Sequence, residues 1–505
     1  FYTAGGTNTL TITGGVLMDQ PETDWSLRFG NHHRSWEQTG CNFIGVQTGG
    51  IVLVQSKEYL HLGSLADHTT ATYDLSGGTV YAFGQSDNAV SIGSGTNNNS
   101  LAAFTLRGSG KLVSRKRIYG NRAEEGANQV FAFQGGTLAT ASYEAVNLRS
   151  EPGGARGTLF NEGGTLAPGD FGVPGRTLVN GSYTNAPNAV IALDIGGASQ
   201  ANSFTNGAGY HDHLMITGNA VLDGALRISL INGFLPDPAS LFYAISCDNP
   251  MTFAAGGFSN AEDNQVWAED GFARFDVTLS NDSKHLLLGN AALNQWAGAS
   301  GGDWDASGAW SLTNPATAEF GAYFGPNLTA AGTVTAEAGR TLRGLAFNNA
   351  VSYTVAGPGA LTLASDGAYG MPRILSLLGS HTLTAALVLQ DALTVDVANA
   401  AGTLTLAGGV TGGKALTKLG AGTLALAGRN VLGAVTVAAG AAAQTGGVSA
   451  FDALEVSPGG VFRLVSGTLT LAQGLTVAPG GAFDFGSYGG GTLRLAVGAP
   501  GGAVD

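Results

Sequence analysis

Two adjacent glycines followed by a short apolar or β-branched stretch recur through the first third of this 505-residue chain. The clear copies are Gly14-Gly15-Val16-Leu17, Gly49-Gly50-Ile51-Val52, Gly77-Gly78-Thr79-Val80, Gly135-Gly136-Thr137-Leu138 and Gly163-Gly164-Thr165-Leu166. A degenerate copy begins at Gly108, and the successive copies lie 35, 28, 32, 26 and 28 residues apart. A repeat of this length predicts a solenoid, in which each coil buries its core against the next coil.

Each repeat also contains two further strand-like phrases in a fixed order. One is a short apolar strand closed by glycine, as in Leu60-His61-Leu62-Gly63, and the other precedes the glycine pair, as in Ala103-Phe104-Thr105-Leu106. Alternation with a period of two indicates strands, and glycine suits the tight bends between them. We therefore predict an all-β fold, a right-handed parallel β-helix whose coils lie about 4.8 Å apart. An antiparallel meander with glycine turns is the alternative.

Composition excludes several functional classes. Only 12% of the residues are charged, about half the usual share, and the 44% of hydrophobic residues argue against disorder. The net charge of −13 leaves no basic stripe for nucleic acid. No run of 18 apolar residues predicts a transmembrane helix. We expect a processed or incomplete chain whose targeting segment lies outside it, because Phe1 falls within a strand-like phrase.

Repeat spacing divides the chain into three expected segments. Residues 1–170 form a first β-solenoid with about 26–35 residues per coil. Residues 171–290 have longer, more aromatic strands and form an irregular β region, either wider coils or a sandwich-like insert that joins the two solenoids. Residues 291–505 form a second, slimmer β-solenoid with about 20 residues per coil, since the Pro-Gly-Gly phrases at 458–460 and 479–481 are 21 residues apart.

Residues 416–430 read Leu-Thr-Lys-Leu-Gly-Ala-Gly-Thr-Leu-Ala-Leu-Ala-Gly-Arg-Asn, and Gly433-Ala434-Val435-Thr436-Val437 follows. This stretch resembles the autotransporter-associated β-strand repeat. Trp304, Asp305, Gly308 and Trp310, together with residues 345–347, are similar to features of large secreted proteins that carry this repeat. The resemblance covers residues 291–505 and implies an exported, surface-attached or extracellular β-solenoid. Residues 500–505 lack the terminal barrel strand that many members of the family have.

Three clusters of chemically active side chains are candidates for ligand sites. His211-Asp212-His213 can present two imidazoles to a metal if the segment is a strand, but a loop is the simpler interpretation. His32-His33 with Cys41 is a weaker candidate. The basic cluster is able to bind uronic acids, although Glu124 and Glu125 make a self-paired polar face the simpler interpretation; its members are Lys111, Arg115, Lys116, Arg117 and Arg122.

Other candidate residues have simpler structural explanations. Asp303 with Asp305, and Glu124 with Glu125, are pairs of acids, but they fit turns or calcium ligands better than glycoside hydrolysis. The glycine-rich phrases lack the Gly-Lys-Ser/Thr of phosphate loops, and residues 97–99 read as a corner loop. The tryptophans at 296, 304 and 310 fit a buried cap better than a sugar platform. Cys41 and Cys247 form either one disulfide or two isolated thiols.

No catalytic, cofactor or metal site emerges from these patterns, so we do not expect an enzyme. The sequence favours a secreted structural β-solenoid on the bacterial surface, which associates with itself end to end or side to side into a fibre, sheath or stalk. Open coil ends, with their unpaired backbone groups, would promote that association. The alternatives are a protein that binds or degrades surface polysaccharide, and an adhesin.

Overall fold

The computed structural model describes residues 6–19, 27–29, 41–57, 59–63, 70–84, 87–93, 101–120, 128–152, 154–365, 371–485 and 490–495. These residues form an all-β structure that has long parallel sheets and a single short 3-10 helix, η1 (Ala145–Asn147). No helix in the described ranges is long and apolar enough to cross a membrane.

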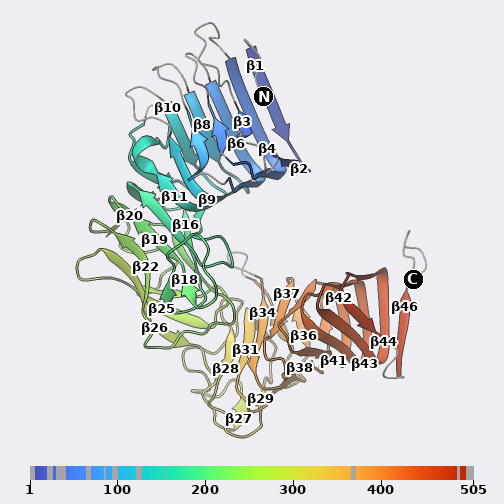
Figure 1. Ribbon diagram of the computed structural model, residues 1–505. Coiled ribbons are helices and arrows are strands. Elements are labelled where there is room, and N and C mark those ends of the chain that lie inside the picture. Colours follow the sequence, from blue (N-terminus) through green and yellow to red (C-terminus); the bar gives the residue numbers. More distant parts are fainter. Residues whose placement is uncertain are drawn as a thin grey trace. The chain divides into compact units, whose positions relative to one another are not determined.

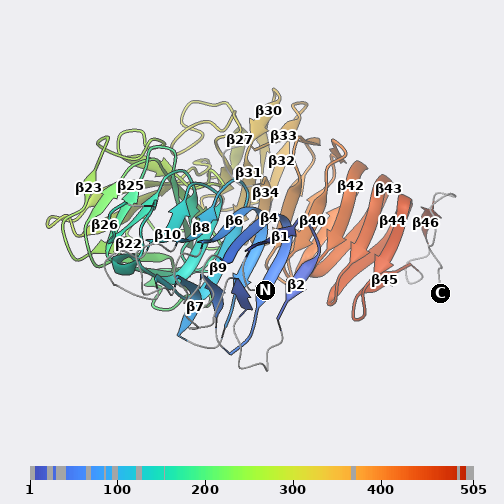
Figure 2. The same ribbon diagram turned by 90° about the horizontal axis from the view of Figure 1, so that it is seen from above.

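The chain divides into two compact units. Residues 1–266 and 275–291 form the first unit, and residues 267–274 and 292–505 form the second. One sheet contains β1 to β26 and another contains β27 to β46. Figures 1 and 2 show that, within each unit, successive coils follow one another in chain order. The further division that we predict near residue 170 stays a prediction.

The strands of the first sheet are β1 (Gly6–Ile12), β2 (Val16–Met18), β3 (Leu27–Phe29), β4 (Cys41–Val54), β5 (Leu60–Leu62), β6 (Thr70–Ala82), β7 (Asn88–Ile92), β8 (Leu101–Leu106), β9 (Lys111–Gly120), β10 (Asn128–Phe133), β11 (Thr137–Glu144), β12 (Thr158–Asn161), β13 (Thr165–Leu166), β14 (Arg176–Asn180), β15 (Ser182–Asn185), β16 (Val190–Ile195), β17 (Ser199–Gln200), β18 (Tyr210–His211), β19 (His213–Ile216), β20 (Ala220–Leu222), β21 (Ala225–Leu230), β22 (Phe242–Cys247), β23 (Thr252–Phe253), β24 (Gln265–Trp267), β25 (Ala273–Leu279) and β26 (His285–Leu293).

The strands of the second sheet are β27 (Gly301–Asp303), β28 (Ala322–Phe324), β29 (Gly332–Thr335), β30 (Arg340–Leu342), β31 (Gly344–Asn348), β32 (Tyr353–Ala356), β33 (Leu361–Leu363), β34 (Arg373–Leu378), β35 (His381–Leu383), β36 (Leu387–Leu389), β37 (Leu393–Val397), β38 (Thr403–Leu406), β39 (Val410–Thr411), β40 (Leu416–Leu419), β41 (Thr423–Leu426), β42 (Arg429–Val437), β43 (Gly440–Val456), β44 (Gly460–Val477), β45 (Ala482–Asp484) and β46 (Gly490–Leu495).

Strand pairing in the second unit repeats every third strand. From β28 to β39, each strand pairs in parallel with the strand three places further along the chain, as β31 does with β34 and β34 with β37. The same holds for β32 with β35 and β33 with β36. This pattern is that of a solenoid-like chain in which three strands make up each turn (Figure 1).

Pairing in the first unit is also mostly parallel, and it continues past residue 170. β11 pairs with β14, β14 with β19, and β19 with β22, all in parallel. Antiparallel pairs also occur in this unit, among them β16 with β18 and β22 with β26. Parallel pairing therefore continues as far as β23, and the choice between wider coils and a sandwich-like insert for residues 171–290 stays a prediction.

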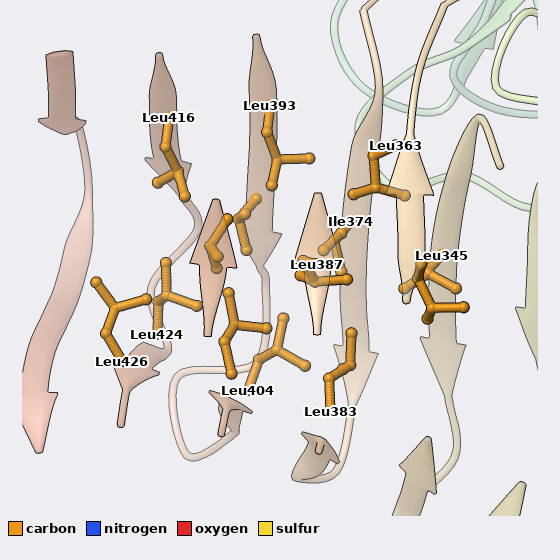
Figure 3. Packing of buried hydrophobic residues seen from close by; sticks show 14 of the residues in the cluster. Leu345, Leu363, Ile374, Leu383, Leu387, Leu393, Leu404, Leu416, Leu424 and Leu426 are labelled. Carbon is orange, nitrogen blue, oxygen red and sulfur yellow. The ribbon is translucent and has the colours of Figure 1, made fainter. Parts of the chain in front are cut away.

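The core of the second unit consists of aliphatic side chains stacked in register. Leu383 is level with Leu406, and Leu406 with Leu426. Figure 3 shows such side chains extending into the space between the strands. Because successive strand residues point to opposite faces, every second residue enters this core. Its burial removes apolar surface from water, and each Å² buried stabilises the fold by about 25 cal/mol.

The first unit contains a buried ladder of aromatic rings. Tyr73 is level with Phe104, and Phe104 with Phe131. The ring centroids lie 5.4 Å and 5.7 Å apart and the rings are stacked. Offset stacking of this kind adds roughly 0.5–1.5 kcal/mol per pair beyond the burial of area. The ladder therefore favours one register between neighbouring coils.

The glycine pairs lie at a corner of the first unit, as the sequence predicts. Gly15, Gly50, Gly78 and Gly136 have positive φ angles between 69° and 76°, which L-residues with a side chain adopt at a cost. From the second copy onward, a Cβ atom at this corner would also collide with the backbone of the preceding coil. The glycines thus permit both the bend and the close approach of the coils.

Two substitutions at this corner separate the bend from the close approach. Gly15 and Gly78 have φ angles of 76° and 75°, but a Cβ on Gly15 meets nothing within 4 Å, whereas one on Gly78 overlaps Gly49 and Gly50. We expect Gly15→Ala to cost about 1 kcal/mol of unfolding free energy from backbone strain. Gly78→Ala should cost clearly more, measured by the midpoint of chemical denaturation. Equal losses would contradict the close packing of coils.

Candidate functional site

The most polar buried cluster of the first unit surrounds residues 211–213, which the sequence analysis identified as a candidate. His211 ends β18 and His213 begins β19, so Asp212 lies between two short strands. All three side chains are buried. The structure adds three partners that lie far away in the sequence, Asp194 on β16, Ser246 on β22 and His285 on β26.

Asp212 holds neighbouring backbone in place. Its carboxylate accepts hydrogen bonds from the backbone N–H of Gly175 at 2.6 Å and of Asp194 at 2.7 Å. Asp194 in turn accepts one from the N–H of Gly172 at 2.5 Å. Burial, followed by the nearby Asp194 charge, raises the pKa of Asp212 well above its usual value. The two carboxyl groups therefore anchor the loop at 172–175.

The two histidines do not share a ligand. His211 has its Nδ1 3.3 Å from the Gly197 carbonyl oxygen, and its ring meets the Phe242 ring edge-on at 5.2 Å. His213 has its Nε2 3.0 Å from Ser246 Oγ. In the described part of the chain, no three His, Cys, Asp or Glu side chains converge in a way that would hold a metal ion.

Ser246 connects two histidines on neighbouring strands. Its Oγ lies 3.0 Å from His213 Nε2 and 3.0 Å from His285 Nδ1. β22 is parallel to β19 on one side and antiparallel to β26 on the other, where Ser246 is level with His285. A hydroxyl has one proton to donate and two lone pairs, so Ser246 can donate to one ring and accept from the other.

Sequence reasoning missed Ser246 and His285 as partners of His213. They lie 33 and 39 residues away from the groups they contact, and only the pairing of β19, β22 and β26 brings them together. Local patterns carry no signal for this arrangement, because a single serine or histidine in a strand is common.

Two members of the basic cluster on β9, Lys111 and Arg117, are paired. Lys111 forms an ion pair with Asp170 at 2.7 Å. Arg117 lies 3.6 Å from Glu144 and donates to Asn88 at 2.8 Å. These partners agree with a self-paired face, although they are not the acids that the sequence suggested. Glu124, Glu125 and Arg122 lie outside the described residues.

Arg115 and Lys116 are the exposed members of this cluster. The Arg115 guanidinium lies 4.0 Å from the centroid of the Phe83 ring, and that of Arg117 lies 5.1 Å from the Tyr119 ring. Phe83 and Tyr119 are half-buried. This part of the outer surface therefore combines positive charge with accessible aromatic rings.

The tryptophan segment is structural. Trp296, Trp304 and Trp310 are buried in the core of the second unit. Trp304 and Trp310 both lie within 6 Å of the Phe324 ring. These rings are not available to stack on a sugar, in agreement with the interpretation as a buried cap.

The acids beside the tryptophans have structural roles as well. The Asp303 carboxylate accepts from the Asp305 backbone N–H at 2.9 Å, as in a turn. Asp305 forms an ion pair with Arg340, and its carboxylate accepts a hydrogen bond from the Asn314 side chain. Both interactions lower the pKa of Asp305, and the hydrogen bond from Asn314 has the larger effect. Neither acid is placed as one of a catalytic pair.

The remaining candidates give little chemistry. The Cys247 thiol is free and buried, and it contacts the Gly218 carbonyl oxygen at 3.1 Å. The side chain of Cys41 lies outside the described part of the structure. His32, His33 and residues 97–99 lie outside the described residues.

The repeat-like stretch at 416–430 uses its polar residues to satisfy backbone groups. Lys418 is buried, and its Nζ donates to the carbonyls of Leu419, Gly420 and Ala439 at 2.7, 2.9 and 3.3 Å. Burial lowers the Lys418 pKa to about 8. Asn430 accepts from the Val410 backbone and donates to Gly428 at 3.1 Å. Both residues link one coil to its neighbours at a corner.

No protein-family model matches the chain. A search of curated proteins also found no match. The resemblance of residues 291–505 to the autotransporter-associated repeat therefore stays a prediction.

The buried His213 should make the stability of the folded chain depend on pH. Burial, with smaller effects of His211 and Arg176, lowers its pKa from 6.5 to about 4. Between these values the unfolded chain binds the proton more readily than the folded chain, so stability falls as pH drops from 6.5 towards 4. A shift of this size corresponds to about 3 kcal/mol.

Thermal unfolding of the wild type and of His213→Gln, followed by circular dichroism between pH 4 and 7, measures this contribution. We expect the melting temperature of the wild type to fall more steeply with acid than that of the variant. Parallel curves would show that His213 does not carry the effect.

Proposed function

We propose that this chain is an extracellular structural β-solenoid, folded as a right-handed parallel β-helix, which forms a fibre, sheath or stalk on a bacterial surface. The observation that carries the proposal is the in-register parallel pairing that runs from coil to coil within each unit. Such pairing joins every coil to the next through backbone hydrogen bonds, and a chain built this way is stiff along its stacking axis. The resemblance of residues 291–505 to a repeat of exported proteins supports an extracellular location.

One face of the second unit suits side-to-side association. Thr333, Thr354, Thr382 and Thr405 follow one another in register on β29, β32, β35 and β38. We call this column the threonine face. Its side chains are half-buried or exposed, and successive members stand about 4.8 Å apart. Edges and faces that resist association usually carry charge, which this column lacks.

Charges placed on the threonine face should prevent this association. We expect the wild-type chain to form filaments or bundles in electron micrographs, with an apparent mass in light scattering that rises with concentration. Thr382→Lys with Thr405→Lys should reduce the apparent mass to that of the monomer, because lysines on opposing faces repel one another. Thr417→Lys, on β40 outside this column, is the matched control and should leave association unchanged.

Wild-type chains that stay monomeric at high concentration would contradict the proposal of self-association. A control variant that loses association as fully as the double variant would contradict the role of this face.

A second candidate function, binding of surface polysaccharide, rests on the exposed pairs of arginine and aromatic rings on the first unit. Guanidinium groups suit the carboxylates of uronic acids, and aromatic rings suit the apolar faces of sugars. A glycan screen separates this candidate from a purely structural role. We expect acidic glycans to bind more tightly than neutral ones, and Arg115→Ala to weaken binding about tenfold. Equal binding of both classes, or none, would contradict it.

A further inference from the structure

The hydrogen-bonded group of His213, Ser246 and His285 has the arrangement of a serine beside a general base. Ser246 Oγ and His213 Nε2 are 3.0 Å apart, within the range at which a base can take a hydroxyl proton. When Nδ1 of His213 carries the ring proton, the lone pair of Nε2 points towards the serine.

His285, on the other side of Ser246, favours the same direction of the hydrogen bond from Ser246 to His213. Its Nδ1 lies 3.0 Å from Ser246 Oγ. When Nδ1 carries the proton, His285 donates to Oγ while Ser246 donates to His213. One lone pair of Oγ is then free to attack an electrophile.

A bulge in β22 turns the site outward. The register of β22 with β26 shifts between Tyr243 and Ile245, and bulges of this kind redirect side chains. Tyr243, which precedes the bulge, is 43% exposed, and Ser246 on the same strand is half-buried. The Tyr243 ring also contacts the His285 ring at 5.4 Å.

Apolar surface lies next to the serine. Leu241, which directly precedes β22, is 47% exposed, and Tyr243 on β22 is 43% exposed. Met215, which is level with Ser246 on β19, is half-buried. An apolar acyl or aryl group placed here would contact these side chains, and no acidic or basic side chain of the serine's own strand would face it.

We propose that Ser246 is a nucleophile for acyl transfer from esters with an apolar acyl or aryl group, with His213 as the general base and His285 as a positioning residue. Oγ attacks the ester carbonyl, so an Oγ–C bond forms and the bond from carbon to the leaving oxygen breaks. The hydroxyl proton passes to His213 Nε2 and from there to the leaving oxygen. Water then releases the acyl group by the same route.

An alkyl fluorophosphonate tests the nucleophile directly, because attack by Oγ on phosphorus expels fluoride and leaves a stable adduct. We expect the wild-type chain to gain one adduct, located on Ser246 by peptide mass spectrometry. Ser246→Ala should gain none. Ser142→Ala removes a half-buried strand serine that has no histidine partner, and it should react like the wild type.

The rate of labelling in histidine variants is the second measurement. His213→Gln should slow labelling at least tenfold, since general-base catalysis contributes roughly 10²–10⁴-fold. The wild-type rate should be level between pH 6 and 8 and halve near pH 4, because the His213 pKa is about 4. Arg176, His211 and His285 are the positive or titratable groups that lower it. His285→Gln should slow labelling and move that midpoint slightly upward, because His285 no longer lowers the His213 pKa.

Circular dichroism of each variant checks that it is folded. Wild-type protein without an adduct on Ser246 would overturn the proposal, as would His213→Gln that reacts at the wild-type rate. A rate that halves near pH 6.5 would show that a histidine other than His213 acts as the base.

Discussion

Parallel backbone pairing between successive coils is the interaction on which the rest of the structure depends. Because each strand bonds to the strand one coil away, the same interior position repeats along a column, as with Leu383, Leu406 and Leu426. Side chains of similar shape then stack on one another, and the core grows by one layer per coil. Neither unit needs helices to cover a sheet, since each coil covers the one before it.

This close stacking sets strict demands at the corners. Backbone atoms of neighbouring coils approach so closely at Gly50 and Gly78 that a side chain would collide. Where a corner leaves carbonyl groups inside, a long polar side chain satisfies them, as Lys418 does with three carbonyls. Buried carbonyls without donors would cost about 1–3 kcal/mol each. The same logic explains Asp212, which accepts backbone N–H groups from a loop.

Features that repeat along the chain could be predicted from sequence, whereas features that occur once could not. The left-handed glycines at 15, 50, 78 and 136 follow from their spacing, and so do the short parallel strands. The partners of the β9 residues, Asp170 and Glu144, are set by the path of later coils. Ser246 and His285 meet only because β26 reverses direction against β22, which no periodic pattern encodes.

Distances between spin labels along one column test the coil stacking most directly. Thr394, Thr417, Thr436, Glu455 and Thr476 are successive register partners. In a chain from which Cys41 and Cys247 have been removed, one nitroxide is attached at position 476 and a second at position 436, 417 or 394. These three pairs span two, three and four coils. We expect the separation to rise by about 4.8 Å per coil. Separations that do not follow the number of coils would contradict the account.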